Sequence, residues 1–371
     1  MDKISPLRLL LKALILFIAF NLLFAALDPL PALGRISAYN GLVPGRARFP
    51  FGENPAQAYS FSLYSLEAMF ASHEFSAAPD AGEYRVILIG DSSTWGTLLK
   101  PEETLAARLN ALELTACDGR RMRFYNLGYP TLSATKDLMI LDEALRSPHP
   151  PDAVLWLVTL QSLPADLQLE SALVANNAAR VDGLIARYGL TSIRGDDPLL
   201  VRPDFWSRTI LGQRRALADL LRLQLYGAMW ASTGIDQFYP DEYKAAQRDL
   251  DPDPTFNGWQ EADFSPGLLS WDILDAGMAA APQVLLVNEP ILISQGANGN
   301  LRYNFFYPRW AYDRYRELLS GRAAAQGWNL LDAWDLAPQT EFTDSPIHLT
   351  PAGEELLAQR VAQALRCELA P

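Results

Sequence analysis

Hydrophobic and polar positions alternate in blocks along most of the chain. Short apolar runs, typical of buried parallel strands, occupy 86–89, 123–126, 153–158, 283–287 and 328–331. Segments with apolar residues at helical spacing lie between and beyond these runs, at 101–114, 133–146, 309–320 and 354–365. This alternation predicts an α/β fold in which crossover helices join the strands of a parallel sheet.

The alternation stops between about 163 and 280. Helical patterns dominate there, at 172–188 and 210–230, and the second has a strongly apolar face that includes Leu217, Leu221 and Leu225. We interpret this segment as a helical insertion that forms a lid over the edge of the sheet. A helix lying on a membrane surface is the alternative, to which Arg214 and Arg222 give modest basic character.

A 19-residue apolar stretch, Leu9–Leu27, is interrupted by Lys12 and Asn21. This length approaches the roughly 20 residues that a spanning helix needs. A cleavable signal peptide is the rival interpretation, but cleavage after Ala26 would place the bulky Phe24 at the −3 position, where small residues are preferred. We therefore favour an uncleaved anchor over 1–30.

Lys3 and Arg8 precede the apolar stretch, Lys12 lies near its start and few basic residues follow directly after it, which predicts that the N-terminus is cytoplasmic and the main domain extracytoplasmic. Residues 31–80, rich in proline, glycine and aromatic side chains, are interpreted as a juxtamembrane arm. The α/β domain then occupies 81–371 and contains the insertion at about 163–280.

The net charge of −12 argues against nucleic-acid binding, which requires a basic surface. The chain has two cysteines, Cys117 after the first predicted helix and Cys367 at the last. In an exported protein they could form one disulfide, and two unpaired thiols are the alternative. The sequence has no motif for a metal, nucleotide or other cofactor, so none is expected.

Candidate chemistry lies where the first strand ends, at Gly90-Asp91-Ser92. A serine at a sharp strand-to-helix turn exposes its hydroxyl at the carboxyl edge of the sheet, which suits a nucleophile. A turn whose Asp91 or Ser92 merely caps the helix is the simpler alternative. Of the three histidines, His348 follows the last strand, and the acidic Asp344 four residues earlier could orient its ring.

These two motifs, Gly90-Asp91-Ser92 and Asp344…His348-Leu-Thr-Pro-Ala-Gly, resemble those of the SGNH (GDSL-type) hydrolase family. The resemblance covers roughly 84–160 and 282–366. It implies a flavodoxin-like three-layer α/β/α sandwich and a serine esterase or acyltransferase. Ser92 would then be the nucleophile and would supply one oxyanion N–H, and His348 would be the general base.

The chain departs from the family pattern at three places. After Asn126, which matches the second block, Thr131 replaces the oxyanion glycine, although Gly128 is nearby. Gln161 falls where the third block has asparagine. The family's acid stands three residues before the histidine, so either the loop lets Asp344 reach His348 or the base works as a dyad.

The resemblance implies an ester substrate, either an acylated carbohydrate or a small ester. A single N-terminal span before such a domain is similar to accessory proteins that modify envelope polysaccharides beside membrane-bound O-acyltransferases. We therefore expect ester hydrolysis or acyl transfer through an acyl-Ser92 intermediate at an O-acetyl group of an envelope glycan, with such an acyltransferase as a partner. A catalytically silent domain that binds glycan or scaffolds an acylation complex is the alternative.

Overall fold

The computed structural model describes residues 5–40, 43, 45–50, 63–245 and 252–365. Five strands in the order β2-β1-β3-β4-β5 form one sheet, and every neighbouring pair is parallel. This is the flavodoxin-like doubly wound order. The strands are β1 (Glu83–Ile89), β2 (Arg121–Asn126), β3 (Ala153–Val158), β4 (Val284–Asn288) and β5 (Asn329–Asp332). The prediction of an α/β sandwich with a parallel sheet is confirmed.

Helices cover both faces of the sheet, because successive strand residues point to opposite sides. Ile87 and Trp156 face one layer of helices, and Leu88 and Leu155 face the other. The first layer contains α6 (Ala134–Leu145), α10 (Trp271–Ala280) and α11 (Arg309–Gln326), and the second contains α5 (Leu105–Ala111) and α12 (Pro351–Ala364). These three layers place the carboxyl ends of all five strands at one edge.

The structure spreads the helices of 163–280 over the first layer rather than gathering them at one edge of the sheet. Helices α7 (Ala172–Ala175) and α8 (Ala178–Tyr188) pack on α6, and α9 (Arg214–Thr233) packs on α3 (Leu66–Ser72). Helix α10, which the sequence analysis did not predict, is the crossover that leads into β4. It packs closely on the sheet, since a Cβ at Gly277 would lie 2.2 Å from the Trp156 ring.

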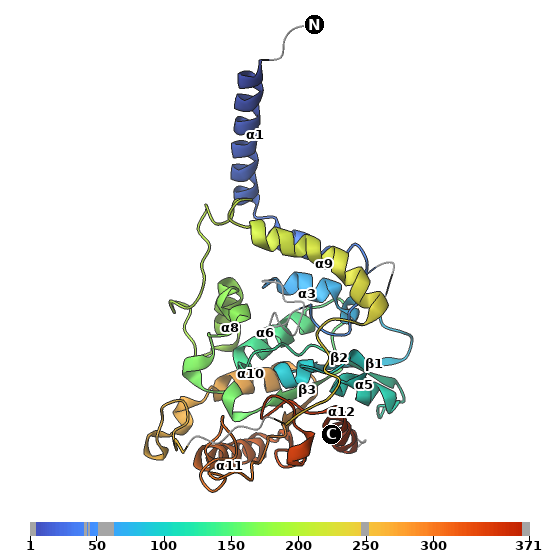
Figure 1. The fold of residues 1–371 in the computed structure, drawn as a ribbon, viewed down its shortest axis with the longest axis vertical. Helices are drawn as coiled ribbons and strands as arrows, with labels where there is room; N and C mark the ends of the chain where they lie inside the picture. The colour runs from blue at the N-terminus through green and yellow to red at the C-terminus, as the bar shows by residue number, and fades with distance from the viewer. Residues whose placement is uncertain (1–4, 41–42, 44, 51–62, 246–251, 366–371) are drawn as a thin grey trace.

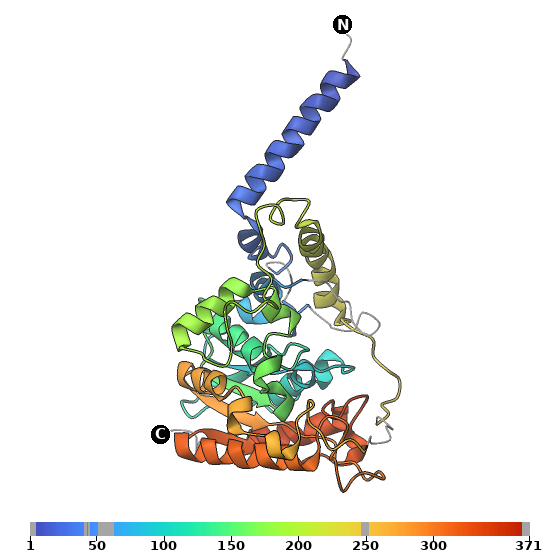
Figure 2. The same ribbon diagram turned by 90° about the vertical axis from the view of Figure 1, so that its left-hand side faces the viewer.

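The N-terminal helix α1 (Pro6–Leu27) projects away from the body of the molecule (Figures 1 and 2). It has a mean hydropathy of 2.4 and is long and apolar enough to cross a membrane. A short helix, α2 (Leu30–Gly34), follows, and the arm then passes beneath α9 toward α3. Much of the predicted arm, including 51–62, lies outside the described residues.

Candidate active site

Ser92 is the first residue of α4 (Ser92–Trp95), a single helical turn directly after β1. Asp91 caps this turn, because its Oδ1 accepts a hydrogen bond from Ser93 N at 2.8 Å. Gly90 is needed for close packing, since a Cβ there would lie 2.2 Å from Thr94 Oγ1. The chain therefore turns sharply at Gly90-Asp91, and Ser92 stands at the carboxyl edge of the sheet.

The structure brings Ser92, His348 and Asp344 together although 256 positions separate Ser92 from His348. Nε2 of His348 lies 2.7 Å from Ser92 Oγ, and Nδ1 lies 2.9 Å from Asp344 Oδ1. The loop that carries both residues is closed by a hydrogen bond from Thr343 N to His348 O at 2.9 Å. This closure lets an acid four residues before the histidine reach the ring.

The charge of Asp344 suits an orienting role. Burial acts to raise its pKa, but the hydrogen bond and charge of His348 outweigh burial and hold that pKa below its usual value. The ionised carboxylate keeps the proton on Nδ1 and leaves Nε2 as the acceptor for the Ser92 hydroxyl. The three side chains have the geometry of the catalytic triad that serine hydrolases use.

We predict that Asp344→Asn lowers the kcat/KM of ester hydrolysis by about 10- to 10³-fold. An amide favours the wrong tautomer of His348, and this change costs about 10⁴-fold in a fully buried triad. The smaller effect is expected because the Asp344 side chain is 43% exposed, so water screens its charge. Turnover of p-nitrophenyl acetate by the full chain measures the loss, with the exposed Asp335→Asn as control. Equal rates for Asp344→Asn and wild type would show that the base works as a dyad.

The predicted oxyanion donors differ in whether their backbone N–H groups already have a hydrogen-bond acceptor. Ser92 N, at the start of α4, has no acceptor among the described residues. Gly128 N donates to Asn126 Oδ1 at 3.0 Å, and Thr131 N donates to Tyr129 O at 2.7 Å. Ser92 N lies at the start of a helix and is therefore the donor best placed to hydrogen-bond a developing oxyanion.

Gln161 pairs with a different partner from the one its motif position implies. Its side-chain amide exchanges long hydrogen bonds with that of Asn257, at 3.5 and 3.3 Å. The triad is not among its hydrogen-bond partners in the described part of the chain. Its oxyanion role stays a prediction.

Asn126 and Gly128 support the nucleophile turn from the neighbouring strand. Asn126 Nδ2 donates to Trp95 O at 3.3 Å, which ties the end of β2 to α4. A Cβ at Gly128 would lie 2.5 Å from Trp95 N, so only glycine allows this close approach of two backbones. The Gly128 position is thus explained by packing against α4.

His73, which has no obvious role in the sequence, binds the end of β2 through a hydrogen bond to Asn126. Its Nδ1 accepts a hydrogen bond from Phe75 N at 3.1 Å, so the proton lies on Nε2, which donates to Asn126 O at 2.9 Å. The ring is fully buried, and burial lowers its pKa to about 3. His73 is therefore neutral in the folded protein.

This neutral histidine predicts an acid-sensitive fold. Between a pH of about 6.5 and 3 the unfolded chain protonates His73 and the folded chain does not, so the free energy of unfolding falls as pH drops. From pH 7 to 5 we expect wild type to lose about 2 kcal/mol more than His73→Gln, which does not titrate. Chemical denaturation at both pH values measures this difference, and the exposed His149→Gln should follow wild type. Parallel losses in wild type and His73→Gln would contradict the assignment.

A buried charged network lies behind the nucleophile turn. Lys136, fully buried on α6, donates from Nζ to Gly90 O at 2.5 Å and Tyr129 O at 3.1 Å. Its charge is balanced by Asp137, whose Oδ1 lies 2.6 Å from Nζ. Burial raises the pKa of Asp137 to about 6 even beside this lysine. Lys136 thus fixes the two loops that flank Ser92.

Glu289, directly after β4, completes this network from the other side. Its side chain is buried and accepts a hydrogen bond from Ser93 Oγ. Burial and the neighbouring Asp91 both raise the pKa of Glu289 well above its usual value. A neutral Glu289 avoids repulsion with Asp91 beneath the nucleophile. The sequence analysis missed both Lys136 and Glu289, because charged residues within a pattern are normally assigned to solvent.

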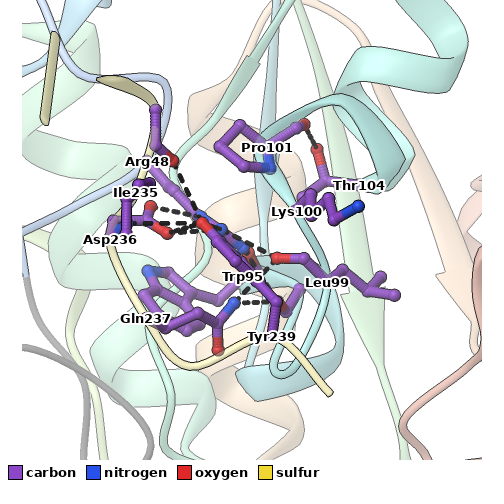
Figure 3. A network of polar contacts seen from close by, with 12 residues as sticks. Arg48, Trp95, Leu99, Lys100, Pro101, Thr104, Ile235, Asp236, Gln237 and Tyr239 are labelled. Carbon is purple, nitrogen blue, oxygen red and sulfur yellow. Dashed lines mark hydrogen bonds and ion pairs between the residues drawn. The ribbon is translucent and has the colours of Figure 1, made fainter. Parts of the chain in front are cut away.

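Figure 3 shows a second support at the far end of the nucleophile turn. Arg48, from the juxtamembrane arm, forms a two-pronged ion pair with Asp236, with both contacts at 2.7 Å. The same guanidinium donates to the carbonyls of Trp95 (3.2 Å) and Leu99 (2.9 Å). Gln237 Nε2 also donates to Leu99 O at 2.8 Å. Segments 188 positions apart thus fasten the chain that follows Ser92.

The predicted disulfide cannot be followed in the structure, because Cys367 lies outside the described residues. Among the residues that the structure describes, there is no cluster of three or more histidine, cysteine or acidic side chains arranged to hold a metal ion.

A scan against protein-family models finds no match, and a search of curated proteins finds none either. Solved structures do match. A carbohydrate acetylesterase family member from Sinorhizobium meliloti is 13% identical, with coverage of 77% of this chain and 99% of that one and a TM-score of 0.36. The M. smegmatis aryl esterase is 16% identical, with coverage of 77% and 99% and a TM-score of 0.37.

A lipolytic G-D-S-L family protein from Veillonella parvula is 11% identical, with coverage of 75% and 96% and a TM-score of 0.36. The solved structures to which this chain is similar thus include a carbohydrate acetylesterase family member, an aryl esterase and a lipolytic G-D-S-L family protein.

Proposed function

We propose that this protein is a serine esterase or acyltransferase that acts on ester bonds through an acyl-Ser92 intermediate. One observation carries the proposal. His348 Nε2 lies 2.7 Å from Ser92 Oγ, and the same ring is held by Asp344 at 2.9 Å. This is hydrogen-bond distance for proton transfer from a nucleophile to its base.

In the proposed reaction, Ser92 Oγ attacks the ester carbonyl carbon while His348 Nε2 takes the hydroxyl proton. Asp344 stabilises the imidazolium that forms. The negative charge on the carbonyl oxygen develops near Ser92 N–H. The carbon–oxygen bond to the alcohol then breaks, the alcohol takes the proton from His348, and acyl-Ser92 remains. Water or an acceptor hydroxyl then attacks the acyl group while His348 takes its proton. The bond between the acyl carbon and Ser92 Oγ breaks, His348 returns the proton to Oγ, and the acid or the new ester is released.

A second oxyanion donor would come from the loop after β2. Thr131 occupies the motif position, but its backbone N–H already donates a hydrogen bond to Tyr129 O. For it to act, substrate binding must exchange that acceptor for the oxyanion. Removal of one oxyanion donor costs on the order of 3 kcal/mol in other acyl-transfer enzymes. This occupied donor is the observation that favours the second candidate function, a silent domain that binds glycan.

Labelling with a fluorophosphonate separates the two candidates. The reagent phosphonylates an activated serine, and mass spectrometry of the digested full chain identifies the modified residue. We expect the adduct on Ser92 in wild type and its loss in Ser92→Ala and His348→Ala, with His149→Ala labelled normally. Absent labelling of wild type together with binding to acetylated polysaccharide would favour the silent domain.

We propose an O-acetyl group of an envelope glycan as the substrate and an extracytoplasmic location for the site. The location is supported by α1, whose length and hydropathy suit a membrane span, and by the basic residues Lys3, Arg8 and Lys12 at its N-terminal end. A membrane-bound O-acyltransferase as partner follows from the resemblance of this domain arrangement. Release of acetate from O-acetylated polysaccharide, compared with acetyl transfer between polysaccharides, tests the substrate.

Retention of α1 in the mature protein is supported by its packing. Asn21 and Ala25 are buried at the base of the helix, and Asn21 Oδ1 accepts a hydrogen bond from Leu211 N at 3.2 Å. A segment destined for removal has no need of contacts with the folded domain. The mass of the protein isolated from membranes tests this point directly, because cleavage near residue 26 would remove the whole of α1.

A further inference from the structure

Helix α9 and the loop before it expose an unusual amount of apolar surface. Six of the exposed large side chains are those of Trp206, Leu211, Leu221, Leu225, Tyr226 and Met229. Leu225 is 72% exposed, and Leu221 and Trp206 are each 69% exposed. We call these six residues the α9 patch. Large apolar side chains exposed in such number mark an interaction site in soluble domains.

The patch is distinct from the face of α9 that packs on the protein. Leu220, Leu223 and Trp230 are buried in a small core with Leu63 and Ala68. Leu221, Leu225 and Met229 stand four residues apart and so form a second apolar stripe on the same helix. A helix whose folding needs only one apolar face therefore carries two.

The position of α9 indicates what covers this second stripe. Figures 1 and 2 show α9 at the base of α1, where it runs across the direction of α1 rather than continuing it. The hydrogen bond from Leu211 N to Asn21 Oδ1, at 3.2 Å, joins the start of the patch to the last turns of α1. The patch is thus continuous with the end of the helix that is long enough to span a membrane.

The charges around the patch suit a lipid surface. Between residues 199 and 235 there are five arginines and two aspartates, in a chain whose net charge is −12. Arg214, Arg215 and Arg222 are exposed on α9 beside the apolar stripe. Apolar and aromatic side chains flanked by arginines are typical of helices that lie at the headgroup boundary.

We propose that α9 and the loop around Trp206 lie in the membrane interface, in the same leaflet from which α1 emerges. The lipid bilayer is the occupant of the α9 patch. This inference rests on the proposed membrane span of α1. It reverses the preference of the sequence analysis, in which the helix forms a lid.

One consequence concerns the active site. The chain that leaves α9 contains Gln237, which donates to the carbonyl of Gly96, and Asp236, which pairs with the Arg48 that binds the same segment (Figure 3). A helix seated in the interface would hold the catalytic domain in a fixed orientation above the lipid. A domain tethered by α1 alone would be free to rotate.

Spin-label accessibility in vesicles tests the proposal on the full chain. Cys117 and Cys367 are first changed to serine, and a nitroxide is attached to Leu225→Cys, Phe20→Cys or Leu356→Cys in turn. Phe20 lies on α1, and Leu356 is an exposed leucine of α12, on the body far from α1. The protein is reconstituted into phosphatidylethanolamine–phosphatidylglycerol vesicles, and collision rates with oxygen and with a water-soluble nickel chelate are compared.

We expect the oxygen-to-nickel ratio at Leu225 to exceed that at Leu356 several-fold, and the ratio at Phe20 to be higher again. The additional changes Leu221→Gln and Met229→Gln should lower the ratio at Leu225 toward that at Leu356. A high ratio at Phe20 with a water-like ratio at Leu225 would overturn the inference and leave a protein partner to cover the patch. Water-like ratios at both positions would overturn the span itself. The rate of ester hydrolysis, measured separately, tests the proposed reaction.

Discussion

Replacement of Ser92 by alanine is expected to lower the turnover of p-nitrophenyl acetate by about 10³- to 10⁶-fold. The substitution removes only the hydroxyl group, and no acyl-enzyme can form without it. The lower bound reflects the residual catalysis that binding and an oxyanion site still give when a triad residue is lost. His348→Ala should be as slow as Ser92→Ala, because the two residues act as one unit.

The double variant Ser92→Ala/His348→Ala provides the sharper test. If the two side chains act in one proton transfer, the double variant is no slower than either single variant. Multiplicative losses would instead indicate two independent roles, and a rate near wild type in Ser92→Ala would place the nucleophile elsewhere. Equal midpoints of thermal unfolding for all variants would show that the losses are chemical. The triad lies at the sheet edge, so these truncations are expected to leave the core intact.

The sequence predicts the fold and the triad because both depend on local patterns placed in a fixed order. Buried parallel strands read as apolar runs, and a serine after the first strand meets a loop before the last helix at one edge of the sheet. The distance between Asp344 and His348 could not be predicted in the same way. It depends on the bond between Thr343 N and His348 O, which sets the shape of the loop.

The supports of the site were not predictable, because each joins charges that appear unrelated in the sequence. Lys136 lies within a helical pattern, where a lysine is normally assigned to the solvated face. Its role depends on Gly90 O, 46 positions away, which approaches only when β1 and α6 are packed. Helix α10 was missed for a related reason, since Gly277 lowers its helical propensity and is retained for contact with Trp156.

The Arg48–Asp236 pair joins segments that are far apart in the sequence, and its disruption should lower the free energy of unfolding more than the loss of any other support of the site. Arg48 is 1% and Asp236 7% exposed, so neither charge can be hydrated if the other is lost. Burial acts to raise the pKa of Asp236, but Arg48 and Arg46 outweigh it and hold that pKa below its usual value. The folded protein therefore holds a buried carboxylate that depends on its arginines.

We expect Asp236→Asn to lower the free energy of unfolding by about 3–5 kcal/mol, because it leaves the Arg48 guanidinium buried without its counter-charge. Arg48→Met should cost a similar amount, since it strands Asp236 with Arg46 at 3.9 Å as its remaining ion-pair partner in the described chain. Chemical denaturation of the full chain in detergent measures both. The exposed pair Arg194–Asp196 offers a matched control, and Asp196→Asn should leave the free energy of unfolding essentially unchanged, because water screens both charges.

The double variant Arg48→Met/Asp236→Leu decides whether the pair stabilises the fold or only avoids a penalty. With both charges removed, the carbonyl of Leu99 keeps the hydrogen bond from Gln237, and that of Trp95 keeps the one from Asn126. The double variant should therefore be more stable than either single variant, because it contains no stranded charge. A loss equal to the sum of the two single losses would mean that each residue acts alone. In that case Arg48 would stabilise the fold through its hydrogen bonds to the carbonyls after Ser92 rather than through its ion pair with Asp236.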